Sequence, residues 1–135
     1  MLCETYTFDP AEGWSRPLRG ELDSERTVAF VFGASRLGAE ACAALDALRA
    51  TLPRAVFVGC STAGEIHGVR VLDESLVVAV ARFRAVSVEY AEAPIGPDGS
   101  SERAGEMLAG KLKRPDLRGV FVLSDGLKVN GSALA

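Results

Sequence analysis

The sequence predicts an α/β fold, with a mixed sheet of about five strands, two packed helices and an N-terminal edge strand. Short apolar runs bounded by glycine or proline predict the strands, and longer segments with apolar residues at helical spacing predict the helices. A strand, helix and strand in direct succession predict two parallel neighbours in one sheet. With 135 residues, 48% of them hydrophobic, the chain is long enough for one domain with a real core.

Residues 1–25 are expected to form the edge strand and a loop, and residues 26–135 the main domain. Apolar side chains alternate with smaller or polar ones at the start, at Leu2, Tyr6 and Phe8. Proline and glycine then predict irregular chain. Trp14 in this loop is expected to cover the core, and a lid over a ligand is the alternative interpretation.

The strand, helix and strand unit occupies residues 27–58. Residues 27–32 are apolar on both faces, which predicts a central strand. Ser35 is expected to cap a helix that runs to about Thr51. The apolar stripe of this helix consists of Leu37, Ala41, Leu45, Leu48 and Leu52. Residues 55–58 predict the second, parallel strand.

Three further strands and a second helix are expected. Segments 75–83 and 86–91 are separated by two residues, which predicts a hairpin. Ser100 or Ser101 is expected to cap the second helix. Its apolar stripe consists of Ala104, Leu108 and Leu112. Residues 119–123 are apolar throughout and predict the fifth strand.

A glycine-rich polar motif follows the second of these strands. It consists of Gly59, Cys60, Ser61, Thr62, Ala63, Gly64 and Glu65. Open α/β sheets bind ligands at the carboxyl ends of their strands, where a turn exposes backbone N–H groups. We expect these groups to receive a carboxylate and Glu65 to receive an ammonium group, as an amino acid would supply. The structural alternative is a tight junction in which Thr62 and Glu65 form a capping box.

The spacing of Gly59 and Gly64 imitates part of a phosphate-binding P-loop. That motif continues with a lysine and a hydroxyl residue, which neutralise phosphate and bind Mg²⁺. Glu65 and Ile66 occupy those positions here. Because the carboxylate would repel a triphosphate, the motif disfavours nucleotide triphosphate binding.

Cys60 supports an enzymatic alternative, a Cys60-dependent hydrolase or transferase. A helix N-terminus at the motif would lower the pKa of the thiol, and His67, the only histidine, would act as the base. A cysteine at the end of a buried strand is otherwise a small core residue. The leading interpretation assigns no catalytic residue.

A second polar motif follows the fifth predicted strand. It consists of Ser124, Asp125, Gly126, Asn130 and Gly131. If strands two and five are neighbours, both motifs line one crevice at the same sheet edge. Asp-Gly and Asn-Gly are also ordinary turn dipeptides. Ser132 is expected to cap a helix that begins just before the end of the chain.

Composition excludes several classes of function. The net charge is −3 and the basic residues are scattered, which argues against nucleic acid and membrane surfaces as partners. Three cysteines without close spacing and one histidine argue against a disulfide framework, a metal site and a cofactor. The first residues lack a signal-peptide pattern, so we expect a cytoplasmic protein.

These segments together resemble the N-terminal FIST domain, a sensory domain of signal-transduction proteins. The resemblance rests on residues 27–33, GCSTAGEI at 59–66, residues 75–80 and VLSDGLKVNGS at 122–132, and it covers roughly residues 20–135. It implies a non-enzymatic, cytoplasmic sensor of small ligands such as amino acids, mainly bacterial. It also implies that the residues of both polar motifs form the ligand-binding site.

The resemblance further implies partners within a longer protein. These are a C-terminal FIST module or a kinase, cyclase or chemoreceptor output module, and a homo-oligomer is compatible with it. Lys128 stands where many relatives have asparagine. The family's module continues beyond residue 132, so a truncated domain is expected. An interaction module completed by another chain is therefore the third interpretation.

Overall fold

The computed structural model describes residues 1–36, 38–95 and 100–135. The chain forms two compact units, Met1–Val88 and Glu89–Ala135, and each is described by itself. The fold class is α/β with a mixed five-stranded sheet, as predicted. Among the described residues, no helix has the length and apolar character needed to cross a membrane.

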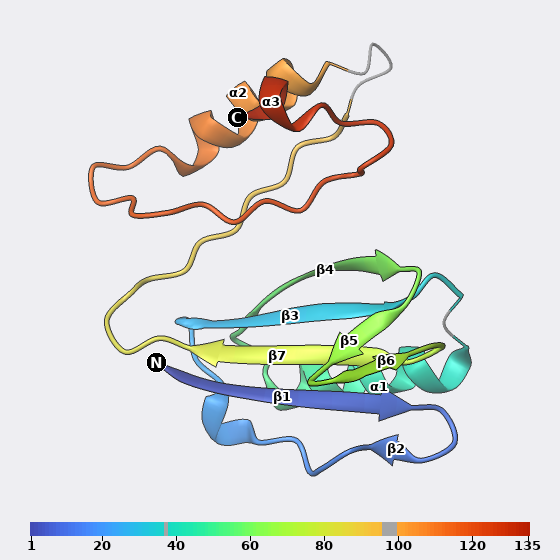
Figure 1. Ribbon diagram of the computed structural model, residues 1–135. Coiled ribbons are helices and arrows are strands. Elements are labelled where there is room, and N and C mark those ends of the chain that lie inside the picture. Colours follow the sequence, from blue (N-terminus) through green and yellow to red (C-terminus); the bar gives the residue numbers. More distant parts are fainter. Residues whose placement is uncertain (37, 96–99) are drawn as a thin grey trace. The chain divides into compact units, whose positions relative to one another are not determined.

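The sheet of the first unit is organised around β7 (Leu76–Arg82). β1 (Leu2–Asp9) pairs antiparallel with one edge of β7, and β3 (Thr27–Ala34) pairs antiparallel with the other. β4 (Val56–Thr62) pairs parallel with β3, which confirms the predicted strand, helix and strand unit. The short β2 (Gly13–Trp14) lies outside β1. The order β2-β1-β7-β3-β4 therefore makes β4 an edge strand (Figure 1).

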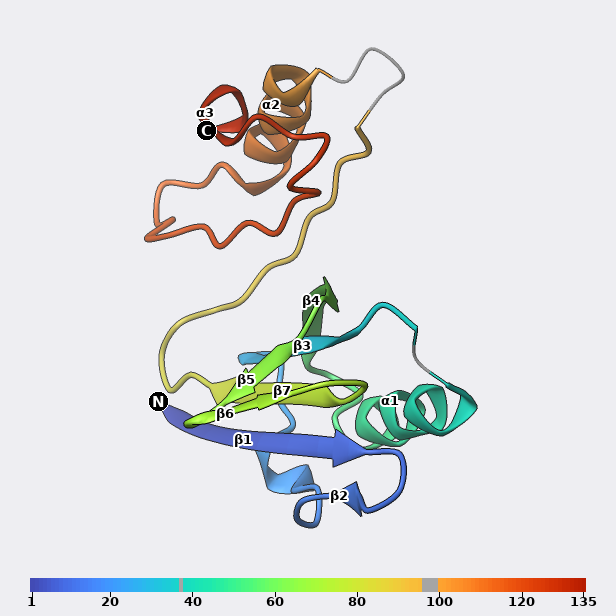
Figure 2. The ribbon, with the colours of Figure 1, turned by 45° about the vertical axis from the view of Figure 1, so that its right-hand side comes forward.

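Helix α1 (Ala39–Thr51) covers one face of this sheet (Figure 2). The short 3-10 helix η1 (Gly20–Leu22) adds Leu22 to the same core. The larger core cluster consists of Tyr6, Leu22, Ala29, Leu48, Leu52, Val78 and Val80. Each large apolar side chain buried in this way contributes about 1.5–3 kcal/mol to folding. Leu48 and Leu52 confirm the predicted stripe of α1, whereas Leu37 lies outside the described residues.

The opposite face of the sheet carries the hairpin of β5 (Glu65–His67) and β6 (Arg70–Leu72). Thr5 alternates with the buried Tyr6 along β1, so its side chain lies on the face away from α1. His67 Nε2 is 3.1 Å from Thr5 Oγ1, which fastens the hairpin to that face. The hairpin turn contains Gly68 with a φ of 62°, a conformation that suits glycine.

Trp14 covers the edge of the core, as predicted. Its ring centroid lies 5.3 Å from that of Phe8 and 6.3 Å from that of Tyr6. The indole packs against both core clusters of the first unit. Such aromatic contacts add about 0.5–1.5 kcal/mol to the area that they bury. The N-terminal segment is therefore a structural part of the sheet.

The second unit consists of α2 (Ser101–Leu112), α3 (Gly131–Leu134) and irregular chain. Ser100 caps α2, as predicted, because its Oγ accepts the backbone N–H of Arg103 at 3.2 Å. The Oγ of Ser101 accepts the backbone N–H of Asn130 at 2.9 Å, which joins the start of α3 to the start of α2.

Two predicted strands, 86–91 and 119–123, are irregular chain instead. Residues 86–91 were expected to pair with the strand that is now β7. Both edges of β7 are occupied by β1 and β3, so no hairpin partner can be added there. Residues 119–123 are exposed and make no strand pairing within the described chain. An apolar run forms a strand only where a neighbour completes its hydrogen bonds.

Two predicted helix caps are wrong. Helix α1 begins at Ala39 with Gly38 as its N-cap, so Ser35 does not cap it. The reason is that β3 extends through Ala34, which pairs with Thr62 and keeps the chain extended up to that point. Helix α3 is capped by Asn130 rather than Ser132. The Asn130 side chain accepts the N–H groups of both Ser132 and Ala133, which satisfies two free donors of the first turn.

A substitution at Gly105 should separate α2 from α3. A Cβ at Gly105 would lie 2.1 Å from the carbonyl oxygen of Leu134, whereas a Cβ at Gly110 in the same helix would meet nothing within 4 Å. Gly105→Ala should therefore speed hydrogen exchange of the α3 amides. Gly110→Ala should instead stabilise α2 by about 0.5–1 kcal/mol, because alanine favours helix. Unchanged α3 exchange in Gly105→Ala would contradict this packing.

Candidate functional site

The first polar motif forms the second half of β4 and the turn after it. Gly59–Thr62 belong to the strand because β3 is long enough to pair with them, up to the Ala34 and Thr62 pair. Ala63 and Gly64 make the turn, and Glu65 begins β5. The sequence predicts the junction directly after residue 58, whereas the strand ends four residues later, at Thr62. Residues 65–67 are strand, so the capping box of a helix, the structural alternative for this motif, is not formed.

Gly59, Cys60 and Ser61 are exposed at the outer edge of the sheet. Because β4 pairs with β3 alone among the described strands, its other edge leaves backbone N–H and C=O groups without a sheet neighbour. Gly59 and Ser61 share the α1 face with Phe57, which packs against the core, and Cys60 belongs to the opposite face. The motif thus presents backbone, a hydroxyl and a thiol at one free edge.

Gly59 is required by the close approach of β4 to β3. A Cβ at this position would lie 1.9 Å from the carbonyl oxygen of Val31 and 2.8 Å from its carbonyl carbon. Val31 is the residue that pairs with Gly59 in the register of the two strands. No side chain fits there without moving backbone, so strand packing explains why the first residue of the motif is glycine.

Glu65 is buried and joins three segments of the chain. Its side chain is only 2% exposed. Oε1 accepts a hydrogen bond from the Thr62 hydroxyl at 2.5 Å, and Oε2 accepts from the Ser75 hydroxyl at 2.8 Å. The Ser75 backbone N–H points to Oε2 at 3.4 Å. The carboxylate therefore connects the end of β4 and the start of β5 to the residue that precedes β7.

This arrangement satisfies a buried carboxylate with hydroxyl and amide donors. No lysine or arginine forms an ion pair with Glu65 in the described part of the chain. Hydrogen bonds to a charged group are each worth about 1.5–3 kcal/mol, and a buried carboxylate without them would be costly. Both oxygens are engaged within the protein, so the geometry gives Glu65 a positioning function at the motif.

Ser75 is a site residue that the sequence did not reveal. It was predicted only as the first residue of a strand, and it lies ten positions from Glu65 along the chain. The β5–β6 hairpin reverses the chain between them and brings the two residues together. A single serine before an apolar run carries no signal of this contact, which depends on tertiary folding.

The structure keeps Cys60 and His67 in separate surroundings. Cys60 is an exposed free thiol on β4. His67 on β5 interacts with Thr5 through Nε2. Within the described residues, no hydrogen bond joins the thiol to a base, and no group of three or more histidine, cysteine, aspartate or glutamate residues is placed to hold a metal ion.

The second polar motif lies in the second unit, as an exposed turn followed by α3. Asp125 Oδ1 accepts the backbone N–H of Leu127 at 2.9 Å, and Lys128 Nζ lies 3.6 Å from Oδ2. The bond from Leu127 and the charge of Lys128 outweigh the effect of burial and lower the pKa of Asp125. Ser124, Gly126 and Gly131 are exposed. Asn130 is engaged as the cap of α3.

Alanine at Gly59 should destabilise the first unit, whereas alanine at Gly64 should not. The clash with the Val31 carbonyl should cost about 1–3 kcal/mol, as for overpacking elsewhere. A Cβ at Gly64 would make ordinary contact, 3.6 Å from Asp73 Oδ1, so its effect should stay within about 0.5 kcal/mol. Urea denaturation of both variants measures the difference. Equal stability of the two variants would contradict the close approach of the strands.

Glu65→Gln should destabilise the protein by about 1–3 kcal/mol, because the amide turns one of the two acceptor oxygens into a donor that faces the Thr62 or the Ser75 donors. Glu12→Gln, at an exposed loop position, is the matched control and should leave stability nearly unchanged. Thr62→Val combined with Glu65→Gln should cost less than the sum of the single changes, since the two side chains share one bond. Strict additivity of the pair in urea denaturation would argue against this contact.

Comparison with known proteins identifies the family of the chain. A family model described as the FIST N domain matches residues 27–135, which is most of the chain and includes both polar motifs. Comparisons with curated proteins and with solved structures find no match. The match begins at the first residue of β3 and agrees with the resemblance seen in the sequence. The chain therefore belongs to the FIST family of signal-transduction sensors.

Proposed function

We propose that this FIST domain senses a small ligand that carries a carboxylate, such as an amino acid, without chemical conversion. The free edge of β4 is the observation that supports it. Gly59, Cys60 and Ser61 are exposed there, within the motif that characterises the family resemblance. Backbone N–H groups at this edge and the Ser61 hydroxyl would receive the carboxylate, because oriented donors favour an anion.

In this proposal Thr62 and Glu65 hold the binding edge in place and do not contact the ligand. Their hydrogen bonds fix the turn at Ala63 and Gly64 relative to β7. A binding edge held by buried contacts loses less conformational entropy when the ligand binds. Glu65 thus supports recognition indirectly and does not serve as the acceptor of an ammonium group.

The second motif stays a predicted ligand-binding segment of the second unit, described by itself. Asp125 has an exposed carboxylate whose pKa is lowered by the Leu127 N–H, so it is ionised at neutral pH and suited to an ammonium group. Asn130 uses its side-chain oxygen to cap α3, which leaves its amide N–H₂ for other contacts. The Ser124 hydroxyl and the backbone groups of Gly126 and Gly131 would complete the hydrogen bonds to the ligand.

The proposal also includes a non-enzymatic domain in the cytoplasm, coupled to a C-terminal FIST module or an output module. Cys60 lacks a hydrogen-bonded base among the described residues, whereas nucleophilic catalysis commonly relies on an adjacent base. Cys3, Cys42 and Cys60 are all free and exposed. Free thiols are typical of reducing compartments.

Thermal unfolding in the presence of each of the twenty amino acids tests the proposal. A ligand at about a hundred times its Kd should stabilise the protein by about 2.7 kcal/mol, a shift of several degrees for this length. Ser61→Ala should reduce the shift, and Ser87→Ala, at an exposed position outside both motifs, should retain it. No shift with any compound at millimolar concentration, or an equal loss in both variants, would overturn the proposed site.

A second candidate is an interaction module that another chain completes. The run Val120–Leu123 and Leu127 are apolar yet exposed, and Leu127 is 99% exposed. Apolar surface of this kind commonly marks a protein contact. Light scattering distinguishes the candidates, since a monomer that shows a ligand-dependent shift favours the sensor and a dimer without one favours the module.

A further inference from the structure

A pocket lined by four arginines lies at the sheet end opposite the first polar motif. The motif follows the Ala34 and Thr62 pair, where β3 and β4 end. The pocket lies where β1 and β3 begin and β7 ends, since Leu2 and Thr27 both pair with Arg82. It belongs entirely to the first unit and has a volume of about 560 Å³. This is within the usual range for a small-molecule site.

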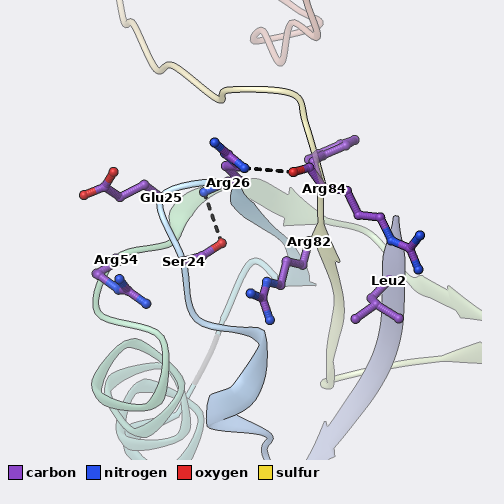
Figure 3. A pocket seen from close by; sticks show the side chains of 8 residues that line it. Leu2, Ser24, Glu25, Arg26, Arg54, Arg82 and Arg84 are labelled. Atoms are coloured by element: carbon purple, nitrogen blue, oxygen red, sulfur yellow. Dashed lines mark hydrogen bonds between the residues drawn. The ribbon is translucent and has the colours of Figure 1, made fainter.

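The lining of this pocket is strongly basic. It consists of Leu2, Ser24, Glu25, Arg26, Arg54, Arg82, Phe83 and Arg84. Figure 3 shows the arginines around the hollow, with the carboxylate of Glu25 directed away from Arg26, Arg82 and Arg84. The whole chain carries a net charge of −3, so this concentration of positive charge is local. Such a cluster focuses a field that attracts anions.

Three of the arginines are held by the protein. Arg54 Nε donates to Asp23 Oδ2 at 3.0 Å, and Arg54 Nη2 donates to the Asp23 carbonyl at 3.0 Å. Arg82 Nη1 donates to the carbonyl of Glu21 at 2.8 Å. Arg26 Nη1 donates to the carbonyl of Arg84 at 2.8 Å, as drawn in Figure 3.

These bonds position the guanidinium groups without using all of their donors. A guanidinium carries five N–H donors in a planar fork, so each of the three keeps donors for a ligand. Of the four bonds that anchor Arg26, Arg82 and Arg54, three go to neutral carbonyls, which leave the positive charge uncompensated. Among the described residues, Arg54 is the only one of the four that forms an ion pair with a carboxylate, that of Asp23.

Asp23 remains ionised despite its surroundings. Burial alone would raise its pKa, but the hydrogen bonds and the charge of Arg54 outweigh burial and lower it. Arg54 is therefore largely neutralised by Asp23. Arg26, Arg82 and Arg84 carry the charge that a ligand would meet, and the Arg84 guanidinium has no hydrogen bond or ion pair within the described residues.

We propose that this pocket binds a small molecule that carries two or more phosphate groups. Three guanidinium groups that form no ion pair with a carboxylate of the described residues match the multiple charges of such an anion, and the arginine fork matches the geometry of phosphate oxygens. The half-buried Phe83 and the exposed Leu2 supply apolar wall beside the charged groups. The site is separate from the amino-acid-like ligand proposed for β4, and it lies at the other end of β3.

Isothermal titration of the intact chain with tripolyphosphate tests this site. We expect saturable binding at low ionic strength that weakens as salt is added. Arg84→Gln removes one charge and breaks no side-chain bond within the described residues, and it should raise the Kd by about fivefold to tenfold, the loss of one arginine–phosphate contact. Arg70→Gln makes the same charge change on β6, outside the pocket, and should change the Kd by less than about twofold.

Amide chemical shifts of the unmodified protein provide a second measurement. Tripolyphosphate should shift the amides of residues 24–26 and 82–84 and leave those of residues 59–65 in place. Absence of saturable binding at millimolar tripolyphosphate, or equal weakening by Arg84→Gln and Arg70→Gln, would overturn the site. Equal affinity for citrate would overturn the assignment of phosphate. Amino-acid binding at β4 would shift the amides of residues 59–65 instead. Failure of the phosphate site and failure of the amino-acid site are therefore observed at different residues.

Discussion

The pairing of β7 on both of its edges is the constraint on which the first unit depends. β1 and β3 each align with nearly the whole length of β7. The N-terminal strand therefore takes the position that a hairpin with residues 86–91 would have occupied. On the other side β3 pairs with β4, which is the last strand of the sheet in that direction, and the first polar motif is exposed at its free edge. The N-terminal residues thus complete one side of the sheet, and the polar motif ends the other.

The two ends of the sheet differ in their chemistry. Where β3 and β4 end, the polar groups are hydroxyls, backbone and one carboxylate. The carboxylate is buried, so no charged group of the motif is exposed to solvent at this end. Where β3 begins and β7 ends, the polar groups are arginines. Antiparallel pairing places the carboxyl end of β7 beside the amino end of β3, and this alone brings Arg82 and Arg26 together. One sheet can therefore present two ligand chemistries through strand direction.

The sequence predicted those features that depend on neighbours in the chain. Residues 27–32, 55–58 and 75–83 each lie within or overlap an observed strand, and Ser100 caps α2, because apolar runs and caps are local signals. The family was also predicted correctly, from GCSTAGE and its distance to the second motif. The Glu65 and Ser75 contact was missed, since a hairpin separates the two residues. The arginine pocket could not be predicted, because Arg26, Arg54 and the Arg82 and Arg84 pair come from three distant parts of the chain and meet only in the folded sheet.

Trp14 gives this protein a convenient optical reporter. It is the only tryptophan, and it packs beside Tyr6 and Phe8 at the margin of the first unit. The other tyrosine, Tyr90, belongs to the second unit. Indole fluorescence therefore follows the loosening of β1 and β2, whereas far-ultraviolet circular dichroism sums over α1, α2 and α3. If the two signals change at the same denaturant concentration, the chain unfolds in one cooperative transition. If they change at different concentrations, its parts unfold in separate transitions.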